Sequence, residues 1–291
     1  MSIKIGTDCS GIEAPIQALL NLKIPFRHVF SSEIDKYCIE SIKANYSPEF
    51  IFSDITTRNI DDIPNIDLYV AGFPCQPFSC AGKQKGFSDR RGNIFYNCID
   101  VIKNKKPKYF VLENVKGLCK KGVWENIQNE LDTLVDYNVN WKILNTKDYG
   151  IPQNRERVYI VGIRKDLKIK FEWPEKKPLP CLKNFIDCLD ESKFETKRMR
   201  LQVPDDSVYI DLNFQRGRTY PNSGIYSPCL NTNTGLWNVK MGRYANCNEY
   251  LMLQGFPKTF KRVVSISQFK KQIGNSMSVN VLEEIFKKLI H

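Results

Sequence analysis

The first half of the chain alternates short apolar runs with segments whose apolar residues recur at helical spacing. This alternation of strand and helix is typical of a doubly wound sheet. The pattern predicts strands at 3–7, 27–32, 50–52, 66–71 and 108–112, and helices at 14–22, 36–45, 93–103 and 123–135. Two further strands, near 141–144 and 157–163, are expected to pair like a hairpin. We therefore expect an α/β fold, with a mostly parallel twisted sheet and helices on both faces.

The character of the chain changes at Lys165, where Lys, Pro and Glu become frequent and the strand–helix alternation is lost. A helical segment returns at 248–253, and an apolar-periodic helix at 279–290 closes the chain. We therefore expect residues 165–242 to form a small mixed or β domain. Residues 1–164 and 243–291 would then make up one discontinuous catalytic and cofactor-binding domain.

The composition limits which binding partners and which active-site chemistry we expect. A net charge of +11 favours a polyanionic partner, although a merely soluble basic protein would also fit. No run is apolar for long enough to span a membrane, and the N-terminus opens into a strand, so we expect an intracellular protein without a signal peptide. The ten cysteines include no Cys-x-x-Cys pair, and only two histidines occur, which disfavours a zinc site and a Cys–His catalytic pair.

Cys75 directly follows the apolar run at 66–71, and Pro74 and Pro77 stiffen the segment around it. In open α/β sheets, ligands bind at the carboxyl ends of the strands. Cys75 is therefore placed like a nucleophile. The alternative is an inert buried cysteine, since free cysteine is among the most buried residue types.

Polar residues and glycine recur at the ends of successive predicted strands. Right-handed crossovers would bring these positions into one crevice: Gly11, Glu33, Asp54, Cys75 and Glu113. The first strand-to-helix turn lacks Gly-x-Gly-x-x-Gly, which favours a ligand that carries adenosine without a pyrophosphate. Glu33 is the candidate for the ribose hydroxyls. Ile34 is placed to pack on a purine face, and Asp54 to accept a bond from an exocyclic amine.

Several motifs together resemble the cytosine-5 DNA methyltransferases in order and spacing. They are Phe73-Pro74-Cys75-Gln76, Glu113-Asn114-Val115, Gln153-Asn154-Arg155-Glu156-Arg157 and Gly274-Asn275-Ser276. The resemblance covers nearly the whole chain except much of 165–242. It implies a Rossmann-like class I methyltransferase fold, with 165–242 as the target-recognition domain.

The resemblance also implies a mechanism. The target cytosine leaves the duplex, and the Cys75 thiolate attacks ring carbon 6. Glu113 holds ring nitrogen 3, Arg157 reaches the carbonyl oxygen of the base, and Arg155 supports the pocket and the thiolate. Carbon 5 then takes the methyl group of S-adenosylmethionine, which leaves S-adenosylhomocysteine, and no metal takes part.

Cofactor contacts carry over by resemblance to Cys9, Gly11, Glu33, Ile34, Asp54, Ile55, Ile94 and Asn275. The first turn departs from the family, because Cys9 replaces an aromatic residue and Glu13-Ala14 replaces a glycine pair. We expect the loss of stacking at Cys9 to weaken cofactor binding. Glu13 is placed to contact the charged methionine portion of the cofactor instead.

The expected partner is double-stranded DNA, and monomeric action is the family default. The basic loop at 81–92 is predicted to close over DNA through Lys83, Lys85 and Arg91. Base readout is expected from loops around Arg216, Arg218, Asn222, Asn231, Asn233 and Trp237. The same chemistry on tRNA and a catalytically silent DNA-binding regulator are the alternatives. The target sequence does not follow from these residues.

Overall fold

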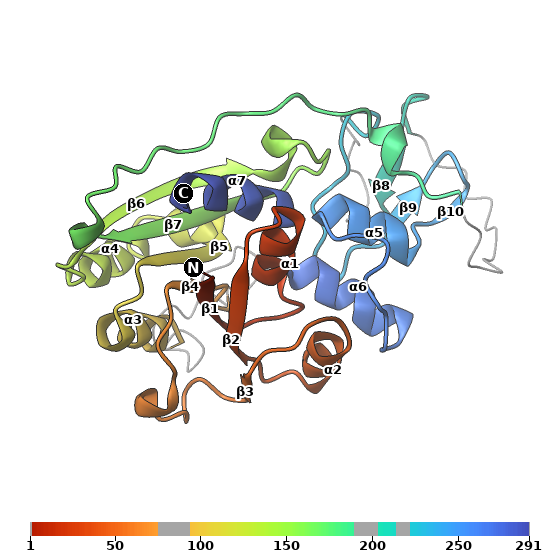
Figure 1. The fold of residues 1–291 in the computed structure, drawn as a ribbon. Helices are drawn as coiled ribbons and strands as arrows, with labels where there is room; N and C mark the ends of the chain where they lie inside the picture. Colours follow the sequence, from red (N-terminus) through yellow and green to blue (C-terminus); the bar gives the residue numbers. More distant parts are fainter. Residues whose placement is uncertain (1, 75–93, 189–202, 214–221, 291) are drawn as a thin grey trace. The chain divides into compact units, whose positions relative to one another are not determined.

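The computed structural model describes residues 2–74, 94–188, 203–213 and 222–290 (Figure 1). The chain forms two compact units. The first comprises Met1–Leu144, Glu156–Pro174 and Leu282–His291, and the second comprises Asn145–Arg155 and Glu175–Val281. The chain thus leaves the first unit and returns to it for its last residues. None of the helices within the described ranges is long and apolar enough to cross a membrane.

A seven-stranded sheet, in the order β3-β2-β1-β4-β5-β7-β6, forms the centre of the first unit. The strands are β1 (Ile3–Asp8), β2 (Phe26–Ser32), β3 (Phe50–Phe52), β4 (Leu68–Ala71), β5 (Tyr109–Val115), β6 (Tyr137–Asn145) and β7 (Glu156–Arg164). The first five strands run parallel, and β7 pairs antiparallel with β5. The prediction of a mostly parallel sheet is confirmed. Strand order reverses between β1 and β4, where open α/β sheets bind ligands.

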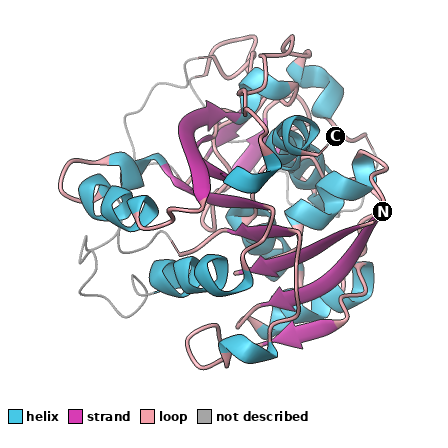
Figure 2. Ribbon diagram, turned by 60° about the vertical axis from the view of Figure 1, so that its left-hand side comes forward, coloured by secondary structure: helices cyan, strands magenta, loops and turns pink. Residues whose placement is uncertain are grey.

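Helices cover this sheet (Figure 2). They are α1 (Ala14–Asn21), α2 (Lys36–Asn45), α3 (Ile94–Lys105), α4 (Trp124–Asp132) and the end of α7 (Val279–Leu289). The Asp35 side chain caps α2 by accepting a bond from the backbone N–H of Tyr37. The Asn21 amide donates to the Glu283 carboxylate at 2.6 Å, which ties α1 to the returning α7.

The core of the first unit lies along β4 and β5. All four residues of β4 are buried, and so are Phe110, Val111 and Leu112 of β5. Strands buried on both faces are expected to be continuously apolar, as β4 is. This apolar centre holds the polar residues at the carboxyl ends of the strands in fixed positions.

Within the described residues, the second unit contains a small antiparallel sheet in the order β10-β9-β8 and two complete α-helices. Its elements are β8 (Tyr209–Asp211), β9 (Leu236–Asn238), β10 (Arg243–Tyr244), α5 (Cys247–Gln254) and α6 (Ile266–Asn275). Asn246 and Glu249 form a capping box at the start of α5. By its bounds, the second unit is larger than the segment 165–242 predicted as a small domain. That this segment recognises the target sequence stays a prediction.

A buried ion pair joins the end of β1 to the loop after β3. The Arg58 guanidinium donates to both carboxylate oxygens of Asp8, at 2.7 and 2.8 Å, and Tyr69 donates to the same carboxylate at 2.7 Å. Arg58 also lies over the rings of Phe30 and Phe52. Asp8 precedes the first turn, so this pair links two loops of the carboxyl edge.

Arg58→Ala is expected to lower the free energy of unfolding by about 3–5 kcal/mol, because it leaves the buried Asp8 carboxylate without its counter-charge. Urea denaturation measures this loss. Arg27→Ala is the control, since Arg27 pairs with Glu49 at the surface, where an ion pair contributes about 1 kcal/mol or less. Equal losses in the two variants would contradict the structural role of the Asp8–Arg58 pair.

Candidate active site

The turn after β1 and the end of β2 are joined directly. The backbone N–H of Gly11 donates to Glu33 Oε2 at 2.7 Å, and the N–H of Asp35 donates to Glu33 Oε1 at 2.9 Å. Burial raises the pKa of Glu33, and the two backbone donors partly offset this effect. Ile34, next along the chain, is 72% exposed. The residues predicted to contact a ribose and a purine are thus a carboxylate in a fixed position and the exposed apolar side chain next to it.

Asp54 lies on the loop after β3, in the next position along the edge. Its Oδ1 accepts bonds from the backbone N–H and the hydroxyl of Thr56, at 2.8 and 2.7 Å. Ile55 is buried, and Ile94 at the start of α3 packs against the core of the first unit. Three neighbouring strands thus end in residues that were predicted to contact the cofactor.

Cys9 is partly exposed as a residue, but its sulfur atom is buried, which makes it a poor nucleophile. Burial of the sulfur atom, reinforced by neighbouring negative charges, raises the pKa of the Cys9 thiol well above its usual range. The thiol therefore stays protonated at neutral pH, and thiolates are the reactive form. Cys9 can therefore line the expected cofactor site without acting as a second nucleophile.

Glu113 lies inside β5, which corrects the expectation that this strand ends at residue 112. It is buried, and it faces Tyr159 of the antiparallel neighbour β7. Arg157 Nε, also on β7, lies 3.3 Å from Glu113 Oε1. A buried carboxylate and a guanidinium are therefore held side by side on two rigid strands.

Asn114 connects this pair to the segment that precedes Cys75. Its side-chain amide donates to the backbone carbonyl of Phe73 at 3.1 Å, and both residues are buried. β4 is hydrogen-bonded to β5, so the chain that leaves β4 towards Cys75 starts beside Glu113. Cys75 itself lies outside the described residues, as do Lys83, Lys85, Arg91, Arg216 and Arg218.

Arg155 belongs to the second unit, unlike Arg157 two residues later. It is 2% exposed, and its guanidinium donates to the backbone carbonyls of Leu230, Gly274 and Ser276, at 2.6, 3.2 and 2.7 Å. It therefore fixes both neighbours of Asn275, which is itself exposed at the end of α6. A Cβ atom at Gly274 would lie 2.4 Å from the carbonyl oxygen of Asn231, so the close approach there requires glycine.

Trp237 does not lie on a recognition loop. It is 5% exposed in the middle of β9, and its ring meets that of Tyr244 edge-on at 5.2 Å. It packs in the interior of the second unit, so its place among the expected base-reading residues is wrong. Asn231 and Asn233 are exposed and stay predictions.

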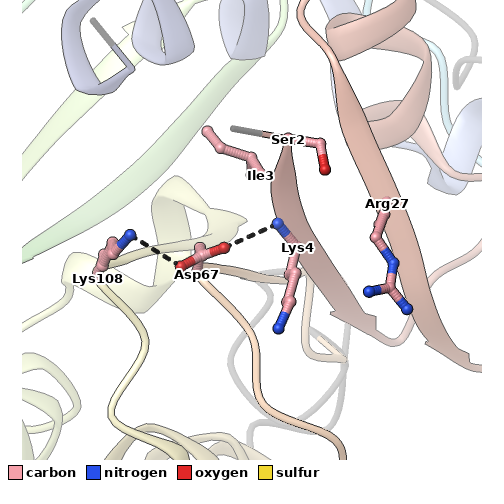
Figure 3. A pocket seen from close by; sticks show the side chains of 6 residues that line it. All are labelled: Ser2, Ile3, Lys4, Arg27, Asp67 and Lys108. Atoms are coloured by element: carbon pink, nitrogen blue, oxygen red, sulfur yellow. Dashed lines mark hydrogen bonds and ion pairs between the residues drawn. The ribbon is translucent and has the colours of Figure 1, made fainter.

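The opposite edge of the sheet carries a pocket with different properties. It is lined by residues at or near the amino ends of the strands, including Lys4, Asp67 and Lys108 (Figure 3). Asp67 accepts a bond from the Lys4 backbone N–H at 3.0 Å and pairs with Lys108 at 3.1 Å. These contacts join strand ends to one another and leave the carboxyl edge as the candidate active site.

Comparisons with known proteins identify the family of this chain. The model of the family described as C-5 cytosine-specific DNA methylase matches residues 7–224 and 215–291. The Type II methyltransferase M.HaeII of Haemophilus aegyptius is 39% identical over 91% of this chain and 86% of its own length. M.NgoBI of Neisseria gonorrhoeae, also a Type II methyltransferase, is 39% identical over 88% of this chain and 84% of its own length.

Solved structures agree on the fold. A mutant DNMT2 of Spodoptera frugiperda matches with a TM-score of 0.77 at 21% identity, and each chain is covered completely. The Dnmt2 methyltransferase of S. pombe matches with a TM-score of 0.73 at 20% identity, over 99% of this chain and 98% of its own.

This chain therefore belongs to the C-5 cytosine-specific DNA methylase family. It is a DNA cytosine-5-methyltransferase, which uses S-adenosylmethionine to methylate cytosine in DNA.

Proposed function

We propose that this enzyme methylates one cytosine within a specific short sequence of double-stranded DNA, flips that base out of the duplex, and attacks it covalently with Cys75. The observation that carries the proposal is the pairing of the buried Glu113 carboxylate with Arg157, together with the Asn114 contact to the start of the segment that leads to Cys75. The Glu113–Arg157 pair and the start of the segment that leads to Cys75 thus lie near the ends of β5 and β4.

The Glu113–Arg157 pair suits one edge of a cytosine. An extruded base is read through hydrogen bonds to its Watson–Crick edge. The Glu113 carboxyl can hold ring nitrogen 3 and accept from the exocyclic amine, while the Arg157 guanidinium donates to the carbonyl oxygen. Because both side chains come from paired strands, their spacing is set before the base arrives, which reduces the cost of reorganisation during reaction.

Cys75 supplies the nucleophile in this proposal. Its thiolate forms a bond with ring carbon 6, while the protonated Glu113 carboxyl gives its proton to nitrogen 3 and so neutralises the negative charge that the ring gains. Carbon 5 thereby becomes electron-rich. After methylation, loss of the carbon-5 proton to a base allows the electron pair to expel Cys75, which breaks the bond to carbon 6 and restores the ring. The proton returns from nitrogen 3 to Glu113 when the ring is restored.

The residues at the carboxyl edge fit S-adenosylmethionine. Glu33 would hold the ribose, Ile34 would cover the purine, and Asp54 would accept from its amine, with Cys9, Gly11, Ile55 and Ile94 around them. When bound, this cofactor supplies the electrophilic methyl group. We propose Asn275 as a further cofactor contact and Arg155 as its positioning residue, because Arg155 fixes the carbonyls on either side of Asn275.

Glu33→Ala is expected to raise KM for S-adenosylmethionine about 10- to 100-fold, since hydrogen bonds to a charged group are among the stronger ones. The KM for DNA should stay unchanged. Initial rates at varied cofactor concentration measure the effect. Glu40→Ala is the control, because Glu40 is an exposed acid on α2 in the same unit. An unchanged KM for the cofactor in Glu33→Ala would remove Glu33 from the cofactor site.

Transfer of labelled methyl groups to mixed-sequence duplex DNA tests the proposed substrate, with bisulfite sequencing to locate the products. Label confined to one short sequence is the expected result. Label spread over cytosines without regard to sequence would contradict the proposed specificity. Transfer to tRNA in place of duplex DNA would instead support the RNA alternative.

A further inference from the structure

The turn that carries Gly11 has a strained backbone. Cys9, Gly11 and Glu13 all have positive φ, at 51°, 55° and 60°. Only glycine adopts this left-handed region freely, because other residues have a Cβ atom that crowds the carbonyl oxygen. Residues keep a strained conformation only where surrounding contacts hold them in it, and such residues concentrate at functional sites. The conformation of this turn therefore needs a cause outside its own backbone.

The Glu13 side chain supplies that cause. It is 0% exposed, and its Oε1 accepts bonds from the hydroxyls of Thr7 on β1 and Ser31 on β2, at 2.7 and 2.5 Å. His28 Nε2, also on β2, lies 3.3 Å from the same oxygen. Glu13 thus anchors the end of the turn to two adjacent strands.

From this anchor, hydrogen bonds lead back through the turn. The Thr7 and Ser10 hydroxyls are 2.7 Å apart, and the Ser10 hydroxyl accepts from the Ser32 backbone N–H at 3.0 Å. The Ser10 N–H donates to the Ser32 carbonyl at 3.1 Å. The next residue is Gly11, whose N–H contacts Glu33. A continuous set of bonds therefore connects the Glu13 carboxylate to the Gly11–Glu33 contact.

We propose that Glu13 is a positioning residue for S-adenosylmethionine, which holds the turn at Gly11 in its binding conformation without touching the cofactor. The inference rests on the proposed cofactor role of Gly11 and Glu33. It also corrects the expectation that Glu13 contacts the methionine portion, because a fully buried carboxylate is not accessible to a ligand. A preformed turn lowers the ordering cost of binding, so Glu13 acts on cofactor affinity.

Three substitutions distinguish the effect of the Glu13 side chain from the effect of the strained backbone at this position. Glu13→Gly removes the carboxylate but adopts positive φ freely, Glu13→Ala removes it and keeps the strain, and Glu13→Gln keeps the shape and one acceptor oxygen. Each variant is assayed for KM of S-adenosylmethionine, kcat at saturating cofactor, KM for DNA, and affinity for S-adenosylhomocysteine by calorimetry. Thermal melting reports stability separately.

We expect KM for S-adenosylmethionine to rise about tenfold in Glu13→Ala, since the bonds lost involve a charged group. Glu13→Gly should also raise it, and Glu13→Gln should recover most of the loss. The affinity for S-adenosylhomocysteine should fall in parallel, while kcat at saturation and KM for DNA stay near the wild-type values. Thr7→Val should reproduce part of the effect, because it removes the hydroxyl at the other end of one bond.

Tyr137→Phe is the control for a purely structural role. It removes a buried hydroxyl that donates to the Pro107 carbonyl at 2.7 Å, and it should lower the melting temperature without changing KM for the cofactor. If the Glu13 variants behave in the same way, with lower stability and unchanged cofactor affinity, the proposal is wrong. If instead the wild-type enzyme fails to bind S-adenosylhomocysteine, the proposed cofactor site is wrong, whatever the variants do.

Discussion

Replacement of Cys75 by alanine is expected to lower kcat for methyl transfer to DNA by at least about a thousandfold, because removal of a nucleophile removes the covalent route itself. Binding of DNA and of S-adenosylhomocysteine should persist, since the sulfur atom contributes to the chemical step. Initial rates with labelled S-adenosylmethionine measure the loss, and equilibrium binding assays measure both affinities.

Cys80→Ala is the matched control, as it removes another cysteine from the same segment of sequence. It should retain activity near the wild-type rate. Residual activity of Cys75→Ala within about tenfold of the wild type would show that another group attacks the base or that no covalent bond forms.

Glu113→Gln is the second substitution with a large expected effect. It should lower kcat about 10²- to 10⁴-fold, the range typical of a lost general acid, because an amide cannot deliver the proton that the cytosine ring needs. The KM for S-adenosylmethionine should stay the same, since Glu113 pairs with Arg157, whereas the proposed cofactor contact is Glu33. Steady-state kinetics with saturating DNA separates the two parameters.

The chain offers a close control for this variant. Glu156 is on β7, beside Arg157, and pairs with Lys116 at 3.1 Å, but it is largely exposed. Glu156→Gln should change kcat by no more than about twofold, as surface ion pairs contribute little. Equal losses in Glu113→Gln and Glu156→Gln would indicate a general electrostatic effect and would contradict a specific role of Glu113.

Local patterns predicted much of the first unit. The apolar run of β4 and the capped helix α2 were predicted to within a few residues, because burial on both faces and a capping Asp35 are visible in the sequence. The end of β5 was not predicted correctly. Glu113 and Asn114 are polar, so the pattern ends before them, whereas tertiary contacts with Arg157 and Phe73 keep them inside the strand.

The second unit was harder to predict from sequence. Helix α6 was missed, because it is short and its apolar residues do not form a clear helical pattern: Ile266 is exposed, and only Phe269 and Ile273 are buried large apolar residues. A signal for it existed, since Ser265 caps the helix and accepts a bond from the Gln268 N–H. Arg155 and Arg157 look equivalent in the sequence, yet one is enclosed by backbone carbonyls and the other pairs with Glu113. Only the tertiary structure shows that these two neighbouring arginines make different contacts.

The buried role of Glu13 could not be predicted from its position beside the cofactor turn. An acid near a binding loop is expected to face the ligand or solvent, because a buried carboxylate needs several donors. Those donors come from Thr7 and Ser31 on two different strands. The pairing of β1 with β2 brings them together, and this pairing is a property of the fold.

The most direct test of the central claim is to trap the covalent bond between the enzyme and its base. A duplex that contains 5-fluorocytosine cannot lose a proton from carbon 5, so the final elimination is blocked. With S-adenosylmethionine present, we expect a stable protein–DNA adduct, which peptide mass spectrometry maps to Cys75 among the ten cysteines. Burial raises the pKa of Cys98 to about 12, so its thiol should not react. An active enzyme that forms no adduct, or forms it at another cysteine, would contradict the account.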